Sequence, residues 1–416
     1  MEQFIPPSFN LPLAWMVDFS LPVLLKQVEN LQSVEIQPAD LELLRSLRKE
    51  RLLYVSNHPT NSEPAVAYYV AHRMGTRFNF MASRQVFDWG YGAIGKIIQG
   101  LGAFSVLPGV ADRESVRTAR RVLAAPEGKL VLYPEGEPTS GENDSLMPFQ
   151  PGVSQLAFWA LAEARESDPQ ADIKVLPTFV KYVVTGNDVK IKVDLHTSIR
   201  RLERRFQIEP GNKNLLRRFL TVGRVLLEQA EGEYQVVVGD REDFEYRIGR
   251  LRHAILDGIA DRFKINNYQR DADAIQKLRQ FLSIIEMIEI DYKGIELPRL
   301  SGSELQWMKR ECGKAYDFII IRPEYLVSRP TAERFFEWLN RYDNYVFGKT
   351  NTRTRRAHVF FGPPISLAAW ASRYRENKRR TVEDLTTTLR KEVQKLLDAT
   401  HDLTHPIVRP YDVEGS

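Results

Sequence analysis

The sequence predicts an α/β fold: a mixed sheet flanked by helices, with a mainly helical insertion or appended module. From residue 52 onward, short apolar runs alternate with stretches of helical period, which is typical of strands alternating with helices. Residues 205–347 are instead charged and mainly helical in period. Strand and turn residues return in the sequence HVFFGPP at 358–364. We therefore expect residues 348–416 to supply a strand and a helix that close the α/β core.

The N-terminal segment, residues 1–45, is predicted to be apolar and helical. Aromatic and aliphatic side chains crowd residues 4–24, and Trp15 is among them. Asp18 and Lys26 interrupt this run, so it falls short of the ~18–20 apolar residues of a membrane-spanning helix. It also lacks the basic region and cleavage site of a secretion signal. We expect the segment either to pack on the core or to lie in a membrane interface.

The α/β core is predicted to span residues 46–204. Pro64 at a first helical position and Gly75 just past a last turn predict a helix over 65–74. Asp112 is placed as the N-cap of a second helix over 113–124. The strands are expected at 52–56, 78–82, 103–106, 130–133, 173–182 and 189–195.

The last two segments are predicted from helical periods and one strand. Within 205–347, helices are expected at 215–230, 244–263, 274–290 and 331–342. Beyond the strand near 358–364, Thr381 is expected to cap a final helix. Its apolar stripe is Val382, Leu385, Leu389, Val393 and Leu396.

The composition excludes some kinds of site and limits the partners that the protein can bind. Cys312 is the only cysteine, which excludes an intramolecular disulfide and a cysteine-based metal cluster and fits a reducing cytoplasm. The net charge is only +4 and the isoelectric point about 8.9, which allows anionic lipid headgroups, acyl carriers or nucleotides as partners. No nucleic-acid partner is expected.

The densest group of polar residues follows the strand predicted at 52–56. His58 lies at the carboxyl end of that strand, where α/β folds bind their ligands. Glu63, five residues on, can return to its Nδ1 once the chain turns into the next helix. Nε2 is then the nitrogen that acts as a general base. The alternative is a polar loop in which His58 and Asn57 merely cap the helix.

A second polar loop follows the strand predicted at 130–133. Glu135 can order hydrogen-bond donors or bind a hydroxyl, and Gly136 lets a backbone N–H approach a ligand closely. The alternative is an acidic turn with no chemical role. Two polar loops at two strand ends indicate one shared crevice.

The two loops belong to a longer series of ordered motifs, which resembles the glycerolipid acyltransferases, including the 1-acylglycerol-3-phosphate acyltransferases. That family has a His and, five positions on, an Asp, then a Gly-led strand ending in Arg, then Phe-Pro-Glu-Gly-Thr-Arg, then an apolar strand with Pro. The matching segments here are Asn57-His58-Pro59 with Glu63, Gly102-Ala103-Phe104-Ser105-Val106, Tyr133-Pro134-Glu135-Gly136, Val175-Leu176-Pro177-Thr178, and the additional Met147-Pro148-Phe149-Gln150-Pro151-Gly152-Val153. The resemblance covers about residues 52–182, and 361–364 is similar to the last strand of that domain.

Three positions depart from the family pattern: the acid of the first motif, and the two segments where phosphate-binding arginines are expected. The motif acid is Glu63 rather than Asp, one methylene longer. Leu107-Pro108 stands where the phosphate-binding Arg is expected, and Glu137-Pro138 replaces Thr-Arg. Arg84, Arg113 or Arg117 are the candidates to substitute for the missing arginines.

The resemblance implies an enzyme of O-acyl transfer in lipid metabolism such as phospholipid biosynthesis. His58 is the expected base and Glu63 its orienting partner, with Asn57, Arg84, Arg113, Glu135 and Gly136 as substrate-binding residues. The donor is an acyl thioester, either acyl-CoA or acyl carrier protein, and the acceptor is a lipid hydroxyl. No metal or other cofactor is expected, and the protein is expected to be cytoplasmic and peripherally associated with a membrane surface.

Several alternatives stay open at this point. A thioesterase would use water in place of the acceptor, and a non-catalytic lipid-binding protein would keep the fold without transfer chemistry. The absent arginines favour a neutral hydroxyl acceptor, although lysophosphatidic acid is the acceptor that the resemblance implies. The glycine series at 90–95 matches a dinucleotide fingerprint in letters only, because residues 84–89 separate it from the preceding strand.

Overall fold

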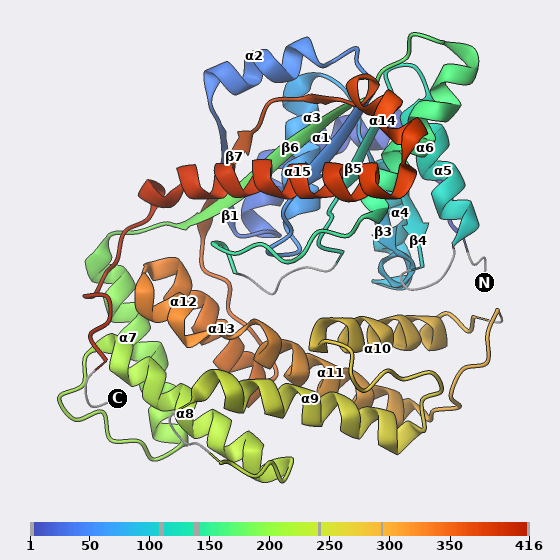
Figure 1. Cartoon of the computed structure of the whole chain (residues 1–416). Coiled ribbons are helices and arrows are strands. Elements are labelled where there is room, and N and C mark those ends of the chain that lie inside the picture. Colours follow the sequence, from blue (N-terminus) through green and yellow to red (C-terminus); the bar gives the residue numbers. More distant parts are fainter. Residues whose placement is uncertain (1–3, 108–111, 137–141, 240–242, 293, 414–416) are drawn as a thin grey trace. The chain divides into compact units, whose positions relative to one another are not determined.

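The computed structural model describes residues 4–107, 112–136, 142–239, 243–292 and 294–413. The chain forms two compact units. The first comprises Met1–Val183 and Thr354–Asp402, and the second comprises Val184–Arg353 and Leu403–Ser416. The first unit holds a sheet flanked by helices and the second is helical, which confirms the predicted α/β class with a helical module (Figure 1).

The sheet of the first unit has eight strands among the described residues. Their order is β1-β7-β6-β2-β5-β3-β4, and β8 pairs with β6 in antiparallel orientation. The central strand β2 is parallel to both β5 and β6, so the carboxyl ends of these three strands meet at one edge of the sheet. The bounds are β1 Leu31–Ile36, β2 Leu52–Ser56, β3 Asn79–Ser83, β4 Ala103–Val106, β5 Lys129–Leu132, β6 Lys174–Val184, β7 Arg355–Phe361 and β8 Ile365–Ser366.

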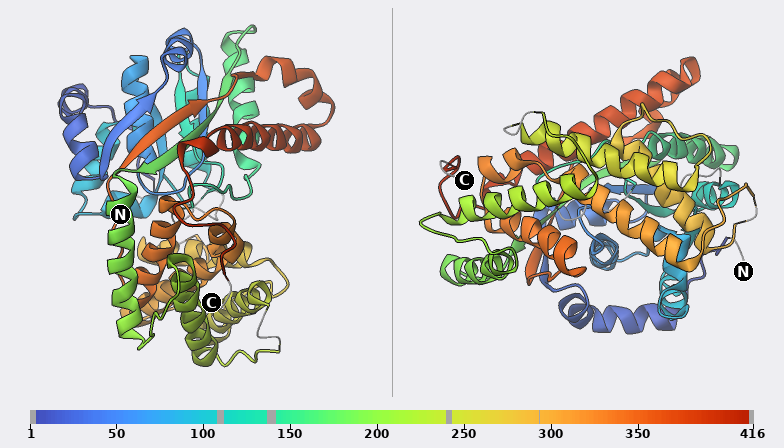
Figure 2. Two further views of the ribbon diagram at one scale, coloured as in Figure 1. Left: turned by 90° about the vertical axis from the view of Figure 1, so that its left-hand side faces the viewer. Right: turned by 90° about the horizontal axis from the view of Figure 1, so that it is seen from below.

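Helices cover both faces of this sheet (Figure 2). One face packs against α1 (Leu11–Gln27), α2 (Pro38–Ser46) and α3 (Glu63–Met74). The other packs against α5 (Arg113–Ala124), α6 (Gly152–Ser167) and α15 (Lys378–Ala399). The remaining helices of the unit are η1 (Arg84–Asp88), α4 (Ala93–Gly100), η2 (Leu367–Trp370), α14 (Ala371–Glu376) and η3 (His401–Leu403), whose last residue belongs to the second unit.

The predicted ends of two helices are confirmed by the backbone. Pro64 lies in the first turn of α3, and Gly75 closes the helix in the left-handed conformation with φ 75°. The side chain of Asp112 accepts a hydrogen bond from the backbone N–H of Ser115 and so caps α5. These short-range signals act locally, which is why sequence alone located them.

The strand predicted at 189–195 is wrong, because these residues belong to α7 (Asp188–Arg205). Their alternation of Lys with apolar residues fits a strand as well as it fits a helix. Two features decide for the helix: Asn187 caps its first turn, and the buried side chains recur at helical spacing. The buried apolar side chains are Ile191, Leu195, Ile199 and Leu202.

Two further expectations need correction. The N-terminal segment 1–45 is not helical throughout, since it contains β1, which pairs in parallel with β7. The final helix begins earlier than predicted, because Asn377 rather than Thr381 is its N-cap. Within that helix, Leu397 is buried beside the predicted stripe, whereas Leu396 is only partly buried.

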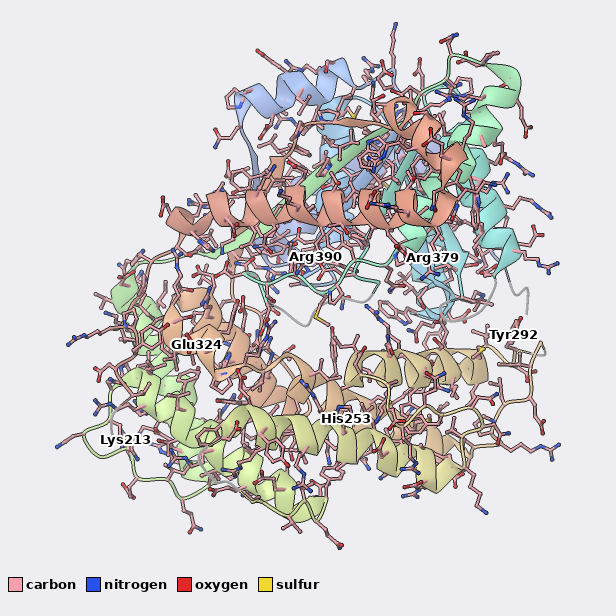
Figure 3. The ribbon with its side chains drawn as sticks, viewed as in Figure 1. Lys213, His253, Tyr292, Glu324, Arg379 and Arg390 are labelled. Carbon is pink, nitrogen blue, oxygen red and sulfur yellow. The ribbon has the colours of Figure 1, made fainter. Side chains whose placement is uncertain are left out.

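The second unit consists of helices among its described residues. α9 packs against α11 and α10. Figure 3 labels His253, which lies on α9. Apolar side chains such as Phe219, Phe335 and Leu339 form its core. Besides α7, the helices are α8 (Leu215–Glu233), α9 (Phe244–Phe263), α10 (Ala274–Glu289), α11 (Gly302–Ile320), α12 (Pro323–Ser328) and α13 (Ala332–Phe347).

Candidate active site

The two polar loops predicted from the sequence meet at the edge of the sheet. Because β2 and β5 are parallel and adjacent, with Val55 paired to Leu132, the residues after each strand emerge side by side. The backbone N–H of His58 donates to Oε1 of Glu135 at 2.9 Å and joins the loops directly. The two strand ends therefore bring the two polar loops into direct contact.

His58 and Glu63 form the central pair of this site. Nδ1 of His58 lies 2.8 Å from Oε2 of Glu63. The Glu63 side chain is only 1% exposed and that of His58 13% exposed. Glu63 is also the first residue of α3, where the helix dipole favours a negative charge. A carboxylate at Nδ1 places the proton there and makes Nε2 the basic nitrogen.

The carboxylate of Glu63 is held by further hydrogen bonds. The backbone N–H of Thr60 donates to Oε2 at 2.9 Å, and the Thr60 hydroxyl donates to Oε1 at 2.8 Å. The hydroxyl of Tyr182, near the end of β6, also donates to Oε1. These bonds fix the direction of the carboxylate toward His58.

The Glu135 carboxyl group accepts hydrogen bonds from two backbone N–H groups of the site. Its Oε2 accepts from the N–H of Met147 at 2.8 Å, while Oε1 holds the N–H of His58. Burial raises the pKa of Glu135 to about 7, and the neighbouring charge of Glu63 adds to this, whereas the two backbone hydrogen bonds and His58 act in the opposite direction. Glu135 thus fixes the loop that carries His58.

Gly136 is required by the turn after β5. Its φ is +86°, and an added Cβ would lie 2.0 Å from Nε2 of Gln150. Its backbone N–H donates to the carbonyl of Tyr133 at 3.0 Å. The geometry therefore assigns this N–H to the turn instead of to a ligand. The residues after it, including Glu137-Pro138, lie outside the described residues.

Asn57 lies beside His58 but is directed into the sheet. Its Nδ2 donates to the carbonyl of Val180 at 3.0 Å, and its Oδ1 accepts from the N–H of Val180 at 2.8 Å. With 1% of its surface exposed, Asn57 ties the loop after β2 to β6. This contact gives it a structural role in place of the expected contact with substrate.

None of the three candidate arginines has a described contact with the His58–Glu63 pair, and Arg117 pairs with Glu114 on α5. Arg84 is 3% exposed, and its Nη1 donates to Oδ2 of Asp88 at 2.9 Å, one turn further along η1. Arg113 is exposed in the first turn of α5. Leu107, which stands where the resemblance leads one to expect an arginine, is 6% exposed.

The structure adds Arg355, which sequence reasoning missed. It begins β7, and its guanidinium lies 4.0 Å from the ring centroid of Tyr182. Nη2 donates to the hydroxyl of Ser62 at 2.9 Å. Ser62 and Arg355 are 293 positions apart in the sequence, so no local pattern links them.

A comparison with protein families found a match within the first unit. Residues 26–181 match the family model described as Acyltransferase. This segment is similar to the acyltransferase family. A search of curated proteins gave no match. The matched domain contains His58, Glu63 and Glu135, and its family supports a general acyltransferase role for the chain.

Two residues that contact the site lie outside the segment that matches the acyltransferase family model. Tyr182 lies just beyond residue 181, where the match ends, and Arg355 lies far beyond it. Both nevertheless reach the loop of the acyltransferase domain that carries Glu63. The C-terminal strand β7 therefore completes this site. Among the described residues, none of the helices has the length and apolar character needed to cross a bilayer.

Proposed function

We propose that the protein transfers a fatty acyl group from an acyl thioester, either acyl-CoA or acyl carrier protein, to the hydroxyl of a lipid acceptor. Nε2 of His58 takes the hydroxyl proton as the oxygen attacks the thioester carbonyl. The carbon–sulfur bond then breaks, and the imidazolium returns the proton to the leaving thiolate. An ester and a free thiol are the products.

The observation that carries this proposal is the 2.8 Å contact between Nδ1 of His58 and Oε2 of Glu63. The buried carboxylate fixes the tautomer and stabilises the imidazolium that forms during proton transfer. A positioned base of this kind contributes ~10²–10⁴ in rate. The family to which residues 26–181 are similar supports the same type of reaction.

The hydroxyl groups of Thr60, Ser62 and Tyr182 support direct transfer without an acyl-enzyme. The Thr60 hydroxyl donates to Glu63, as does the hydroxyl of Tyr182. The Ser62 hydroxyl accepts from Arg355. A covalent mechanism requires a nucleophile that hydrogen-bonds to the base, and these three hydroxyls are directed elsewhere.

For the acceptor, we favour a neutral lipid hydroxyl. A phosphate monoester carries nearly two charges and is best held by the planar fork of an arginine. Leu107 supplies no charge at one of the two expected positions. Arg84 is paired with Asp88, and Arg355 is bonded to Ser62, so using either for a phosphate requires it to exchange partners.

An exposed apolar surface supports association with a membrane. On α1, Trp15 is 64% exposed and Phe19 92% exposed. The neighbouring helix α4 contacts α1 and adds Ile94 and Ile97, which are 41% and 46% exposed. Large contiguous apolar patches with aromatic residues are typical of surfaces that enter a lipid interface. Such a surface suits a protein whose acceptors are insoluble in water.

The direct test is an assay of purified protein with an acyl thioester and a panel of acceptors, followed by mass spectrometry of the lipid products. Acylation of neutral lipid alcohols is expected, and it should depend on His58. Release of free fatty acid without ester formation would identify a thioesterase. Binding without turnover would identify a lipid-binding protein. Efficient acylation of lysophosphatidic acid would replace the neutral acceptor while leaving the acyltransferase assignment standing.

A further inference from the structure

The helical unit contains a pocket of about 230 Å³ that lies entirely within that unit. Its walls are formed by α8, α9, α11, α12 and α13, together with Val413 near the C-terminus. Leu227, Ile248 and Val327 are among the predominantly apolar side chains that line it. An engineered apolar cavity of about 150 Å³ stays dry and binds benzene, so a pocket of this size and lining can hold an apolar group.

Charged and polar groups interrupt the apolar lining. Arg341, on α13, is 3% exposed, and Arg224, on α8, is half-buried. Among the described residues, Asp317 is the one acidic residue of the lining, and burial raises its pKa to about 6 although Arg341 and the hydrogen bond with Asn344 oppose the shift. The described lining of this pocket therefore combines two arginine side chains and one carboxyl group with apolar walls.

One lining residue has an unsatisfied donor. The Trp338 side chain lies in the pocket wall and the residue is 2% exposed. Its indole Nε1–H has no hydrogen-bond partner within the described part of the chain. Buried indole donors usually find a partner, and one left without it costs stability. A ligand that brings an acceptor oxygen to this wall would satisfy it.

We propose that this pocket binds a free fatty acid, with the alkyl chain among the apolar side chains and the carboxylate at Arg341, Arg224 and Trp338. Pockets for small molecules are typically lined by apolar side chains with a few polar groups that fix orientation. A carboxylate is the group that arginine guanidinium groups bind best, and it also supplies an acceptor for the donor of Trp338. This site is formed by other residues than those of the acyltransferase domain and does not depend on the function proposed for His58.

The first test measures binding of a fluorescent fatty acid to the whole protein, with lauric acid as the competitor. Val327→Phe fills the pocket from α12 and should raise the dissociation constant at least about tenfold, because the alkyl chain loses its space. Val189→Phe makes the same change on α7 at a position 70% exposed and should leave it unchanged. Leu220→Phe, also in the pocket wall, is a second filling variant if Val327→Phe fails to fold.

The second test asks whether the carboxylate is recognised. Arg224→Gln should weaken lauric acid about tenfold and leave dodecanol unchanged, since a charged hydrogen bond is lost only with the acid. An equal loss for both compounds would overturn the carboxylate assignment.

A photoreactive fatty acid separates this pocket from any acyl site in the acyltransferase domain. We expect crosslinks in peptides from α8, α11 or α13, and we expect them to persist in the His58→Ala variant. Absence of saturable binding, or binding that Val327→Phe and Leu220→Phe leave unchanged in folded protein, would overturn the proposal. Crosslinks confined to residues 26–181 would do the same.

Discussion

The hydroxyl of Tyr182 donates a hydrogen bond to the carboxylate of Glu63, the residue that orients His58. Tyr182 is 4% exposed, so this bond is formed away from water. Burial and the Glu63 charge raise the pKa of the Tyr182 hydroxyl well above its usual range, so it remains a donor. The acid of the His58–Glu63 pair is thus held from β6, the strand that also carries the motif Val175-Leu176-Pro177-Thr178.

Tyr182→Phe should lower kcat/KM about tenfold or more, because a hydrogen bond to a charged group contributes ~1.5–3 kcal/mol. Tyr133→Phe is the matched control. The Tyr133 ring stacks on His58 with centroids 4.3 Å apart, but its hydroxyl has no hydrogen-bond partner among the described residues. Steady-state kinetics of both variants should show a loss for Tyr182 only. Equal losses would mean that the Tyr182 hydroxyl has no specific role.

His58→Ala should reduce transfer at least about 100-fold while the thermal midpoint changes little, because general-base catalysis is worth ~10² or more. Glu63→Gln should also reduce it strongly by removing the charge that supports the imidazolium. His72→Ala is the control, since His72 lies on the same helix α3 with 43% of its side chain exposed. More than about a tenth of wild-type activity in His58→Ala would exclude the role of base.

Arg355→Met should lower kcat while leaving the fold intact. The change removes the hydrogen bond to Ser62 and the cation over Tyr182, so both supports of the Glu63 loop become less fixed. Arg356→Met is the control on the same strand, because Arg356 is exposed and bonds to Gln32 instead. Kinetics with Arg355→Lys add a second comparison, since lysine keeps the charge but not the planar fork. Unchanged kcat in Arg355→Met would remove this residue from the site.

The difference between His58 and Arg355 shows what sequence reasoning can reach. His58, Glu63 and Glu135 were predictable because each follows a strand with a strong apolar signal, and because neighbouring strand ends in an α/β sheet share one edge. Their spacing is also short enough for a local motif. Tyr182 ends a predicted strand, and its polar hydroxyl after a buried run was the available signal.

No such signal pointed to Arg355. Its partners Ser62 and Tyr182 come before the helical unit in the sequence, whereas Arg355 follows it. Arg355 packs near the end of β6, whereas Gly362, just after β7, bonds to Pro177 near the start of β6. Arg355 therefore reaches the site because its end of β7 lies beside the end of β6. Patterning identified 358–364 as a strand, but strand position within a sheet depends on tertiary pairing.

Glu135 predicts a pH dependence of stability. Below pH 4.5 its carboxyl is protonated in both the folded and the unfolded chain. Between pH 4.5 and about 7 only the unfolded chain ionises, so folding stability falls as pH rises, by at most about 3 kcal/mol. Glu135→Gln cannot ionise. The free energy of unfolding of wild type minus that of Glu135→Gln should therefore decrease from pH 5 to pH 7 in urea titrations. An increasing difference would show that the folded carboxylate is stabilised instead.

The exposed side chains of α1 predict how the protein meets a membrane. Trp15→Ser with Phe19→Ser should lower binding to phospholipid vesicles about tenfold or more, because each apolar side chain that leaves water contributes up to ~1.5–3 kcal/mol. Both positions are more than half exposed, so the fold should be retained. Val237→Ser, at a position 75% exposed in the helical unit, is the control. Vesicle sedimentation measures the bound fraction of each variant. This variant lacks the largest exposed aromatic side chain of α1. If it nevertheless binds as well as wild type, membrane contact lies elsewhere on the protein.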